Sequence, residues 1–262
     1  MIRHNIQSED LTLSYRVVGA GPRDVMLVHG WMVSGAVWDD LVAALDMEGL
    51  RLILPDLRGS GSSGRPQSGY TIEQYAADVL KVADAVGSSR FVIVGHSMGG
   101  TIAQWLSATS PDRISGSILL CPVPAQGQQL PDDVAALFRN CGQNRGMQKT
   151  ILDAACKQLS SAACERLLDD AQGTSVECIS QAFDAWTGGG FSDRLAAIVA
   201  PTLCVATDDP FLPPAYLRQQ IVNLIRGARL AVLPGPGHYV QVEKPAETAA
   251  LLEAFLCALP RE

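Results

Sequence analysis

Short apolar runs alternate with longer segments of helical period along most of this 262-residue chain. The runs are rich in Val, Ile and Leu, as strands that are buried on both faces of a sheet usually are. Such alternation is typical of parallel strands joined by crossover helices. The predicted strands cover residues 11–18, 25–29, 51–54, 91–94, 117–121, 202–206 and 229–233. We therefore expect an α/β fold with a doubly wound, mostly parallel sheet.

Three segments between or after these runs are predicted to be helices. In residues 71–86 apolar side chains recur at the spacing i, i+3, i+4, i+7, and Thr71 with Gln74 resembles a capping box. A second helix is predicted directly after Ser97. The third covers residues 246–259 and follows Pro245, since proline suits the first turn of a helix.

The alternation breaks between residues 122 and 190, where no convincing strand is found. Four short helices are predicted instead, over residues 132–140, 147–159, 162–171 and 176–186. Three consecutive glycines at positions 188–190 then provide a flexible return to the strand pattern. We expect a core formed by residues 1–121 and 191–262, and an inserted helical cap formed by residues 122–190 that lies over the sheet.

The stretch FVIVGHSMGG, residues 91–100, runs from a buried strand into a G-x-S-x-G motif. At a strand-to-helix junction this motif holds the serine in a strained conformation, with its hydroxyl above the sheet. Side chains at Gly95 and Gly99 would collide with the neighbouring strand and helix. The start of the next helix also favours developing negative charge. The same pattern occurs as an ordinary tight turn, so Ser97 is a candidate nucleophile only if it has partners.

A serine hydroxyl needs a base to take its proton, and the base needs an acid to hold its tautomer. Of the four histidines, His238 is the strongest candidate because it lies in a loop after the last predicted strand. Ligands meet an open α/β sheet at the carboxyl ends of its strands. The acid is expected at the end of the preceding strand, where Asp208 and Asp209 are both present. We prefer Asp209.

Five motifs give the chain a resemblance to the α/β-hydrolase fold family over nearly its whole length. They are HGW at 29–31, PDLRGSGSS at 55–63, GHSMGG at 95–100, PTLCVATDDPFLP at 201–213 and GPGHYVQVEKP at 235–245. The family arranges its triad along the chain as serine, acid, histidine. The resemblance therefore implies a triad of Ser97, Asp209 and His238.

The family pattern also bears on the choice of acid. Its acid usually stands four residues before the proline that follows this strand, and counting back from Pro213 gives Asp209. Many relatives have a glycine where this chain has Thr207, and the turn is one residue shorter. Asp208 therefore stays open as an alternative.

The resemblance further implies an oxyanion hole and an acyl pocket. The backbone N–H groups of Met98 and Trp31 would bind the oxyanion. The indole of Trp31 would line the pocket or pack in the core, and apolar cap residues would either wall the pocket or form the cap's own core. The predicted pocket residues are Trp31, Phe211, Leu212, Phe138 and Trp186.

Composition and the remaining motifs argue against several kinds of partner. The net charge of −7 comes from 27 acidic and 20 basic residues with no run of Lys or Arg, so nucleic acid is not expected. Residues 59–64, GSGSSG, match the dinucleotide pattern G-x-G-x-x-G, but neither a helix nor an acidic strand end follows at the required distance. No His or Cys cluster has metal spacing. Neither a cofactor nor a metal ion is expected.

The cysteines and the N-terminal segment bear on location. The seven cysteines are an odd number without a C-x-x-C pair, and several lie in apolar stretches. No export signal and no apolar run long enough to span a bilayer is found. We expect a reduced, cytoplasmic location away from membranes, whereas the oligomeric state is not predicted.

The expected function is that of a serine hydrolase that cleaves a small, largely apolar carboxylic ester or lactone through an acyl enzyme. A serine at this position differs from the aspartate of related dehalogenases and epoxide hydrolases. The segment HGWMVSGAVWD is similar to small esterases related to cofactor-free haloperoxidases, although Met32 stands where perhydrolases often have proline. Alternatives are a carbon–carbon bond hydrolase, a thioesterase or amidase on the same triad, and a receptor-like member with little turnover.

Overall fold

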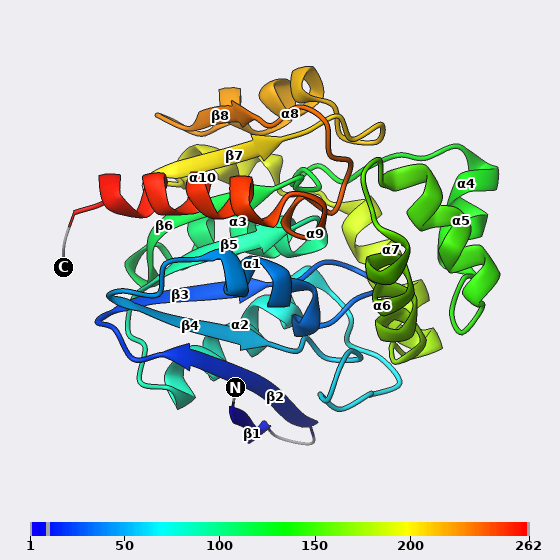
Figure 1. Cartoon of the computed structure of the whole chain (residues 1–262), viewed down its shortest axis with the longest axis horizontal. Helices are drawn as coiled ribbons and strands as arrows, with labels where there is room; N and C mark the ends of the chain where they lie inside the picture. The colour runs from blue at the N-terminus through cyan, green and yellow to red at the C-terminus, as the bar shows by residue number, and fades with distance from the viewer. Residues whose placement is uncertain (1, 9–10, 261–262) are drawn as a thin grey trace.

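The computed structural model describes residues 2–8 and 11–260. A single sheet lies at the centre of this part of the chain (Figure 1). Its strands are β1 (Ile2–Ser8), β2 (Leu11–Gly19), β3 (Arg23–Val28), β4 (Leu50–Pro55), β5 (Phe91–His96), β6 (Ile114–Leu120), β7 (Thr202–Ala206) and β8 (Arg229–Val232). The spatial order is β1-β2-β4-β3-β5-β6-β7-β8. Pairs β1/β2 and β2/β4 are antiparallel and the others are parallel. The predicted mostly parallel α/β sheet is confirmed.

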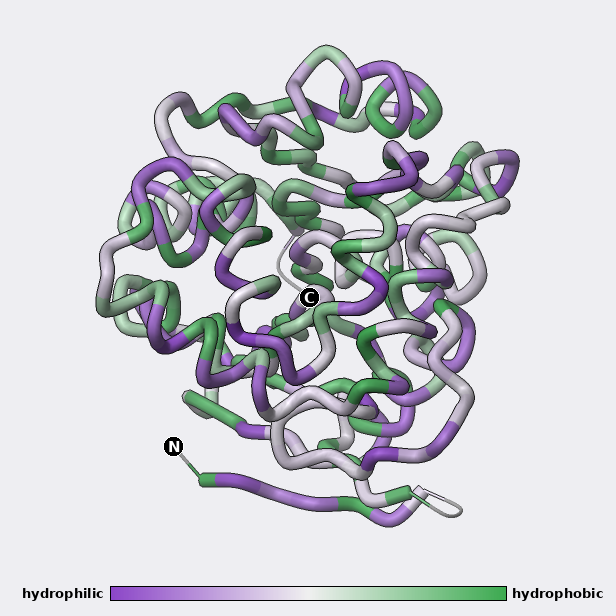
Figure 2. The backbone as a smooth tube through the Cα atoms, turned by 90° about the vertical axis from the view of Figure 1, so that its right-hand side faces the viewer, coloured by the Kyte–Doolittle hydropathy of each residue, from purple (hydrophilic) through white to green (hydrophobic). Residues whose placement is uncertain are grey.

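The seven predicted strands are present as β2 to β8, but β1 was missed. This edge strand pairs only with β2, and most of its side chains are exposed. In Figure 2 it lies near the N-terminus at the lower edge and is largely hydrophilic. The exposed segment Ile2–Ser8 carries no apolar run, so the pattern used for the other strands could not reveal it.

Helices cover both faces of the sheet, with α1 and α10 on one face and α2 and α3 on the other (Figure 1). The helices of the core are α1 (Asp39–Ala44), α2 (Ile72–Ala85), α3 (Met98–Thr109), α8 (Pro214–Gln220), α9 (Val240–Glu243) and α10 (Pro245–Ala258). The Thr71 hydroxyl accepts a hydrogen bond from the Gln74 N–H at 3.2 Å, as the capping pattern predicts. Helices α1, α8 and α9 were missed because they are too short to show a helical period.

Four further helices lie beyond the carboxyl ends of the parallel strands, at the right of Figure 1. They are α4 (Asp132–Arg139), α5 (Arg145–Ala155), α6 (Ser161–Gln172) and α7 (Val176–Gly188), in the region where the sequence predicts the cap. The name cap denotes these four helices and the segments that join them. The predicted helix 147–159 was wrong at its end. Helix α5 stops at Ala155, and the Cys156 N–H still donates to the Leu152 carbonyl. The N–H groups of Lys157 and Gln158, which follow, donate to the side chain of Glu243 instead.

The glycine-rich segment 59–64 packs against the cap. The Ser175 N–H, at the start of α7, donates to the Gly59 carbonyl at 3.1 Å. Gly59 has a φ of +82°, and a Cβ atom on it would lie 2.5 Å from the Cβ atom of Cys178. Gly59 therefore permits close contact between a core loop and helix α7. No helix of the described residues is both long and apolar enough to cross a membrane.

Candidate active site

Ser97 lies in the turn between β5 and α3, with φ 55° and ψ −119°. A positive φ is strained for a residue with a side chain and persists only where surrounding contacts enforce it. The Ser97 N–H donates to the Leu120 carbonyl at 3.0 Å, while the Ser97 carbonyl accepts from the N–H groups of Gly100 and Val123 at 2.8 and 3.1 Å. These bonds to β6, to the segment after it and to the first turn of α3 hold the strained turn in place.

The glycines on either side of Ser97 are required by close backbone contacts. A Cβ atom on Gly95 would overlap the carbonyl oxygen of Gly99 at the start of α3. A Cβ atom on Gly99 would overlap the carbonyl oxygen of Val28 at the end of β3. The motif thus brings β5, α3 and β3 closer together than any side chain at these positions would allow.

His238 lies in the loop after β8 and is hydrogen-bonded to Asp209, which follows β7. The distance from His238 Nδ1 to Asp209 Oδ2 is 2.6 Å, and the Asp209 side chain is completely buried. The second carboxylate oxygen of Asp209 accepts from the Phe211 N–H at 2.8 Å. Because a carboxylate can only accept, Nδ1 of His238 carries the proton and Nε2 is left as the basic nitrogen.

Asp208 has a different environment. Its side chain accepts from the Gly235 N–H at 2.9 Å, and its own N–H donates to the Pro236 carbonyl at 3.1 Å. Asp208 thus shapes the loop that precedes His238, whereas Asp209 contacts the imidazole itself. Of the two aspartates that the sequence left open, the structure brings Asp209 to His238.

Thr207 joins the acid turn to the histidine loop. Its hydroxyl donates to the Gly237 carbonyl at 2.8 Å and accepts from the Asp209 N–H at 3.2 Å. The sequence identified Thr207 only as a departure from the family pattern and gave it no role. No local pattern could have done so, because Gly237 lies 30 residues away along the chain.

Two other histidines near the turn are structural. Burial lowers the pKa of His29 and lowers that of His96 well below its usual value. His29 accepts from the Leu57 N–H at Nε2 (2.9 Å) and donates from Nδ1 to the Gly30 carbonyl (2.8 Å). His96 donates from Nε2 to the carbonyl of His238 at 2.9 Å. Both rings are therefore neutral hydrogen-bonding groups that hold loops around Ser97.

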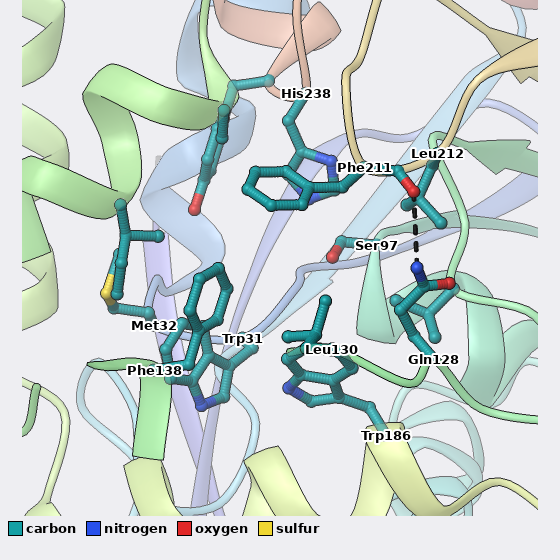
Figure 3. A pocket seen from close by; sticks show the side chains of 14 residues that line it. Trp31, Met32, Ser97, Gln128, Leu130, Phe138, Trp186, Phe211, Leu212 and His238 are labelled. Atoms are coloured by element: carbon teal, nitrogen blue, oxygen red, sulfur yellow. Dashed lines mark hydrogen bonds between the residues drawn. The ribbon is translucent and has the colours of Figure 1, made fainter. Parts of the chain in front are cut away.

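Ser97 and His238 line one cavity between the sheet and the cap, with about 580 Å³ of space including its open mouth. In Figure 3 the hydroxyl of Ser97 lies near the centre of this space, with His238 above it and Trp31 and Trp186 below. All five predicted pocket residues, Trp31, Phe211, Leu212, Phe138 and Trp186, lie on its wall. Gln128 and Tyr239, which the sequence did not single out, are also on the wall.

Aromatic rings from the core and the cap form one continuous side of the cavity. The Trp31 indole stacks on Phe138 of α4 with ring centroids 5.5 Å apart, and its Nε1–H donates to the Ile179 carbonyl at 2.9 Å. Phe138 in turn makes a T-shaped contact with Phe211, with ring centroids 5.9 Å apart. Trp31 is thus fixed by the cap, and the cavity is largely apolar.

The segments expected to supply oxyanion donors lie beside Ser97. A Cβ atom on Gly30 would be 3.0 Å from the Cβ atom of Ser97, so the backbone that leads into Trp31 passes directly alongside. Met98 is the first residue of α3. Among the described residues, no group of three or more His, Cys, Asp or Glu side chains is arranged to hold a metal ion.

The strained serine turn, the Asp209–His238 pair and the doubly wound sheet together define a hydrolase of the α/β class. Residues 25–245 match the model of the alpha/beta hydrolase fold family, and the chain belongs to this family. The resemblance seen in the sequence motifs is confirmed.

Individual relatives are similar over almost the whole chain. A non-heme haloperoxidase from Rhodococcus erythropolis is 29% identical over 250 residues, which cover 88% of this chain and 90% of that protein. A solved structure described as an N-acyl homoserine lactone degrading enzyme is 28% identical with a TM-score of 0.79, covering 96% of this chain and all of that one. An esterase from Exiguobacterium antarcticum shares the fold at 24% identity, with a TM-score of 0.89 and coverage of 97% and 99%.

Proposed function

We propose that the protein is a serine hydrolase that cleaves small, largely apolar carboxylic esters or lactones through an acyl enzyme. The observation that carries the proposal is that His238, bonded to the buried Asp209, faces the same cavity as the strained Ser97. A nucleophile and a base thereby share one cavity, and the orienting acid is bonded to the base from behind. A cytoplasmic location and a small-molecule partner form part of the same proposal.

In the proposed mechanism, Ser97 Oγ attacks the carbonyl carbon while His238 Nε2 takes the hydroxyl proton. The backbone N–H groups of Trp31 and Met98 stabilise the oxyanion of the tetrahedral intermediate. His238 then gives the proton to the departing alcohol oxygen, which leaves Ser97 acylated. Water attacks the acyl group with His238 again as base, and Ser97 is released. Asp209 holds the imidazole in the required tautomer and stabilises its charged form.

The wall of the cavity supports the substrate class. The fourteen described residues that line the cavity include His238 but no Asp, Glu, Lys or Arg. A charged acyl group would lose its hydration there without gaining a partner, whereas apolar groups gain from burial. The lactone-degrading relative is consistent with an ester-like bond as the target. Thioesters, amides and carbon–carbon bonds would use the same three side chains, so a test must begin with the serine.

Covalent labelling tests the proposed nucleophile directly. An alkyl fluorophosphonate should react once per chain, with a bond formed between Ser97 Oγ and phosphorus and fluoride released. Digestion and mass spectrometry are expected to find the adduct on the peptide that contains Ser97. An adduct on another serine, or no adduct under conditions that label an established serine esterase completely, would contradict the proposal.

A pair of esters tests the substrate class. We expect kcat/KM for p-nitrophenyl butyrate to exceed that for p-nitrophenyl hemisuccinate by about 100-fold or more, because the terminal carboxylate would be desolvated in an apolar cavity. Initial rates of p-nitrophenol release measure both esters, and their leaving group is the same. Similar kcat/KM values for the two esters would show that the acyl group does not enter the apolar cavity.

A further inference from the structure

Glu243, at the end of α9, is buried, and its carboxylate accepts four backbone hydrogen bonds. Its Oε2 accepts from the N–H groups of Gly237, Lys157 and Gln158 at 2.9, 2.8 and 2.7 Å. Its Oε1 accepts from the Tyr239 N–H at 3.1 Å. A carboxylate that accepts several N–H groups forms charge-assisted bonds, which are about twice as strong as neutral ones. Glu243 therefore fixes the backbone of two separate segments.

The first segment is the histidine loop. Gly237 and Tyr239 are the residues on either side of His238, so one carboxylate holds the peptide N–H groups before and after the proposed base. The backbone N–H and carbonyl of His238 itself are also hydrogen-bonded. Its N–H donates to the Ala155 carbonyl at 2.9 Å, and its carbonyl accepts from His96 at 2.9 Å. The backbone around His238 is thus held from both directions.

The second segment is the end of cap helix α5. Lys157 and Gln158 follow this helix, and their N–H groups donate to the oxygen that also binds Gly237. The two backbones are in close contact, because a Cβ atom on Gly237 would overlap the Ala155 carbonyl and lie 2.8 Å from the Cys156 Cα atom. Glu243 thereby joins the histidine loop to the cap at a single point.

We propose that Glu243 is a positioning residue for His238, which keeps the imidazole at the distance and angle needed to take the proton from Ser97. The inference rests on the proposed function, since it assigns His238 as the base. Displacement of a reacting group by about 1 Å can cost about 100-fold in rate. Glu243 lies outside the set of residues that line the cavity, so it should affect the rate of reaction more than substrate binding.

The substitution Glu243→Gln separates these effects. Glutamine has nearly the same shape but only one accepting oxygen, and its NH₂ group would face a peptide N–H that needs an acceptor. We expect kcat for p-nitrophenyl butyrate to fall by about 10- to 100-fold while KM changes by less than about threefold. Glu247→Gln is the matched control, because Glu247 is half-exposed and, among the contacts of the described residues, its side chain makes a 3.6 Å ion pair with Lys244 alone. Its kcat should stay within about twofold of wild type.

A double-mutant cycle with His238→Ala shows whether Glu243 acts through the histidine. The wild type, both single variants and the double variant are assayed at a temperature where circular dichroism shows all four to be folded. If Glu243 positions His238, Glu243→Gln costs less than about twofold once the imidazole is gone. If Glu243→Gln does not fold, Gly237→Ala takes its place, because its Cβ atom would push the cap segment off the loop. It should show the same dependence on His238.

Three outcomes would overturn the proposal, and they are distinguishable. An equal loss of rate in both backgrounds would mean that Glu243 supports the fold in general. Wild-type kcat in Glu243→Gln, with His238→Ala inactive, would mean that the loop keeps its position without Glu243 and would leave the proposed function intact. Wild-type kcat in His238→Ala would remove the proposed base, and the role of Glu243 with it.

Discussion

The Ser97→Ala variant is expected to lose ester hydrolysis by a factor on the order of 10⁶ in kcat. Only the hydroxyl oxygen that would attack the carbonyl is removed. Alanine keeps the Cβ atom, so the strain at φ 55° and the backbone bonds of the turn stay as they are. Any remaining rate would come from substrate binding and the oxyanion donors. The measurement is the initial rate on p-nitrophenyl butyrate at saturating and subsaturating concentrations.

Ser89→Ala is the matched control for this experiment, because Ser89 is exposed and precedes β5, whereas Ser97 follows it. Its rate should stay within about twofold of wild type, as is usual for exposed sites. If Ser97→Ala keeps more than a few per cent of the wild-type rate, Ser97 is not the nucleophile. If the wild type itself turns over no ester but binds one, and Ser97→Ala binds it equally well, the receptor-like alternative is favoured.

Asp209→Asn is expected to lower kcat by a factor on the order of 10⁴, in line with the same change in other triads. The carboxylate accepts the proton of His238 Nδ1 at 2.6 Å, and an amide can instead present an NH₂ group to that nitrogen. The imidazole would then carry its proton on Nε2, where it cannot act as a base. Burial of the Asp209 side chain leaves water no access to replace the lost bond.

The neighbouring Asp208→Asn provides a matched control in the same turn. Asp208 accepts only from the Gly235 N–H among the bonds described, and the asparagine side-chain oxygen can still accept it. We expect a change in kcat of less than about threefold, because a conservative loop substitution alters the local fold little. Measured kcat values for both variants, with circular dichroism to show that they are folded, decide between the two acids. A larger loss in Asp208→Asn than in Asp209→Asn would reverse their assignment.

Most strands and helices that the sequence predicted correctly are buried on at least one face, where the apolar pattern is strongest. Strands β2 to β8 overlap every predicted apolar run. Strands β3 to β7 are mostly buried, because a strand in the middle of a sheet has to be apolar on both faces. Strand β8 lies at an edge and is largely not buried, but it still carries a short apolar run, Leu230 to Val232. Strand β1 has no such requirement, since it forms an exposed edge and is held by backbone bonds to β2. Helix α5 ends before the apolar pattern does, because Glu243, 86 residues away from Lys157, takes up the next N–H groups.

The sequence by itself determined the class of fold, the serine turn and the order of the candidate residues, because strand burial and a tight turn depend on residues that are neighbours along the chain. Only the tertiary structure decided that Asp209 and not Asp208 contacts His238, that Phe138 and Phe211 close one side of the cavity, and that Glu243 joins the cap to the histidine loop. These features are hydrogen bonds and ring contacts between segments far apart in sequence. Their geometry exists only once the sheet and the cap have packed together, so no local pattern encodes it.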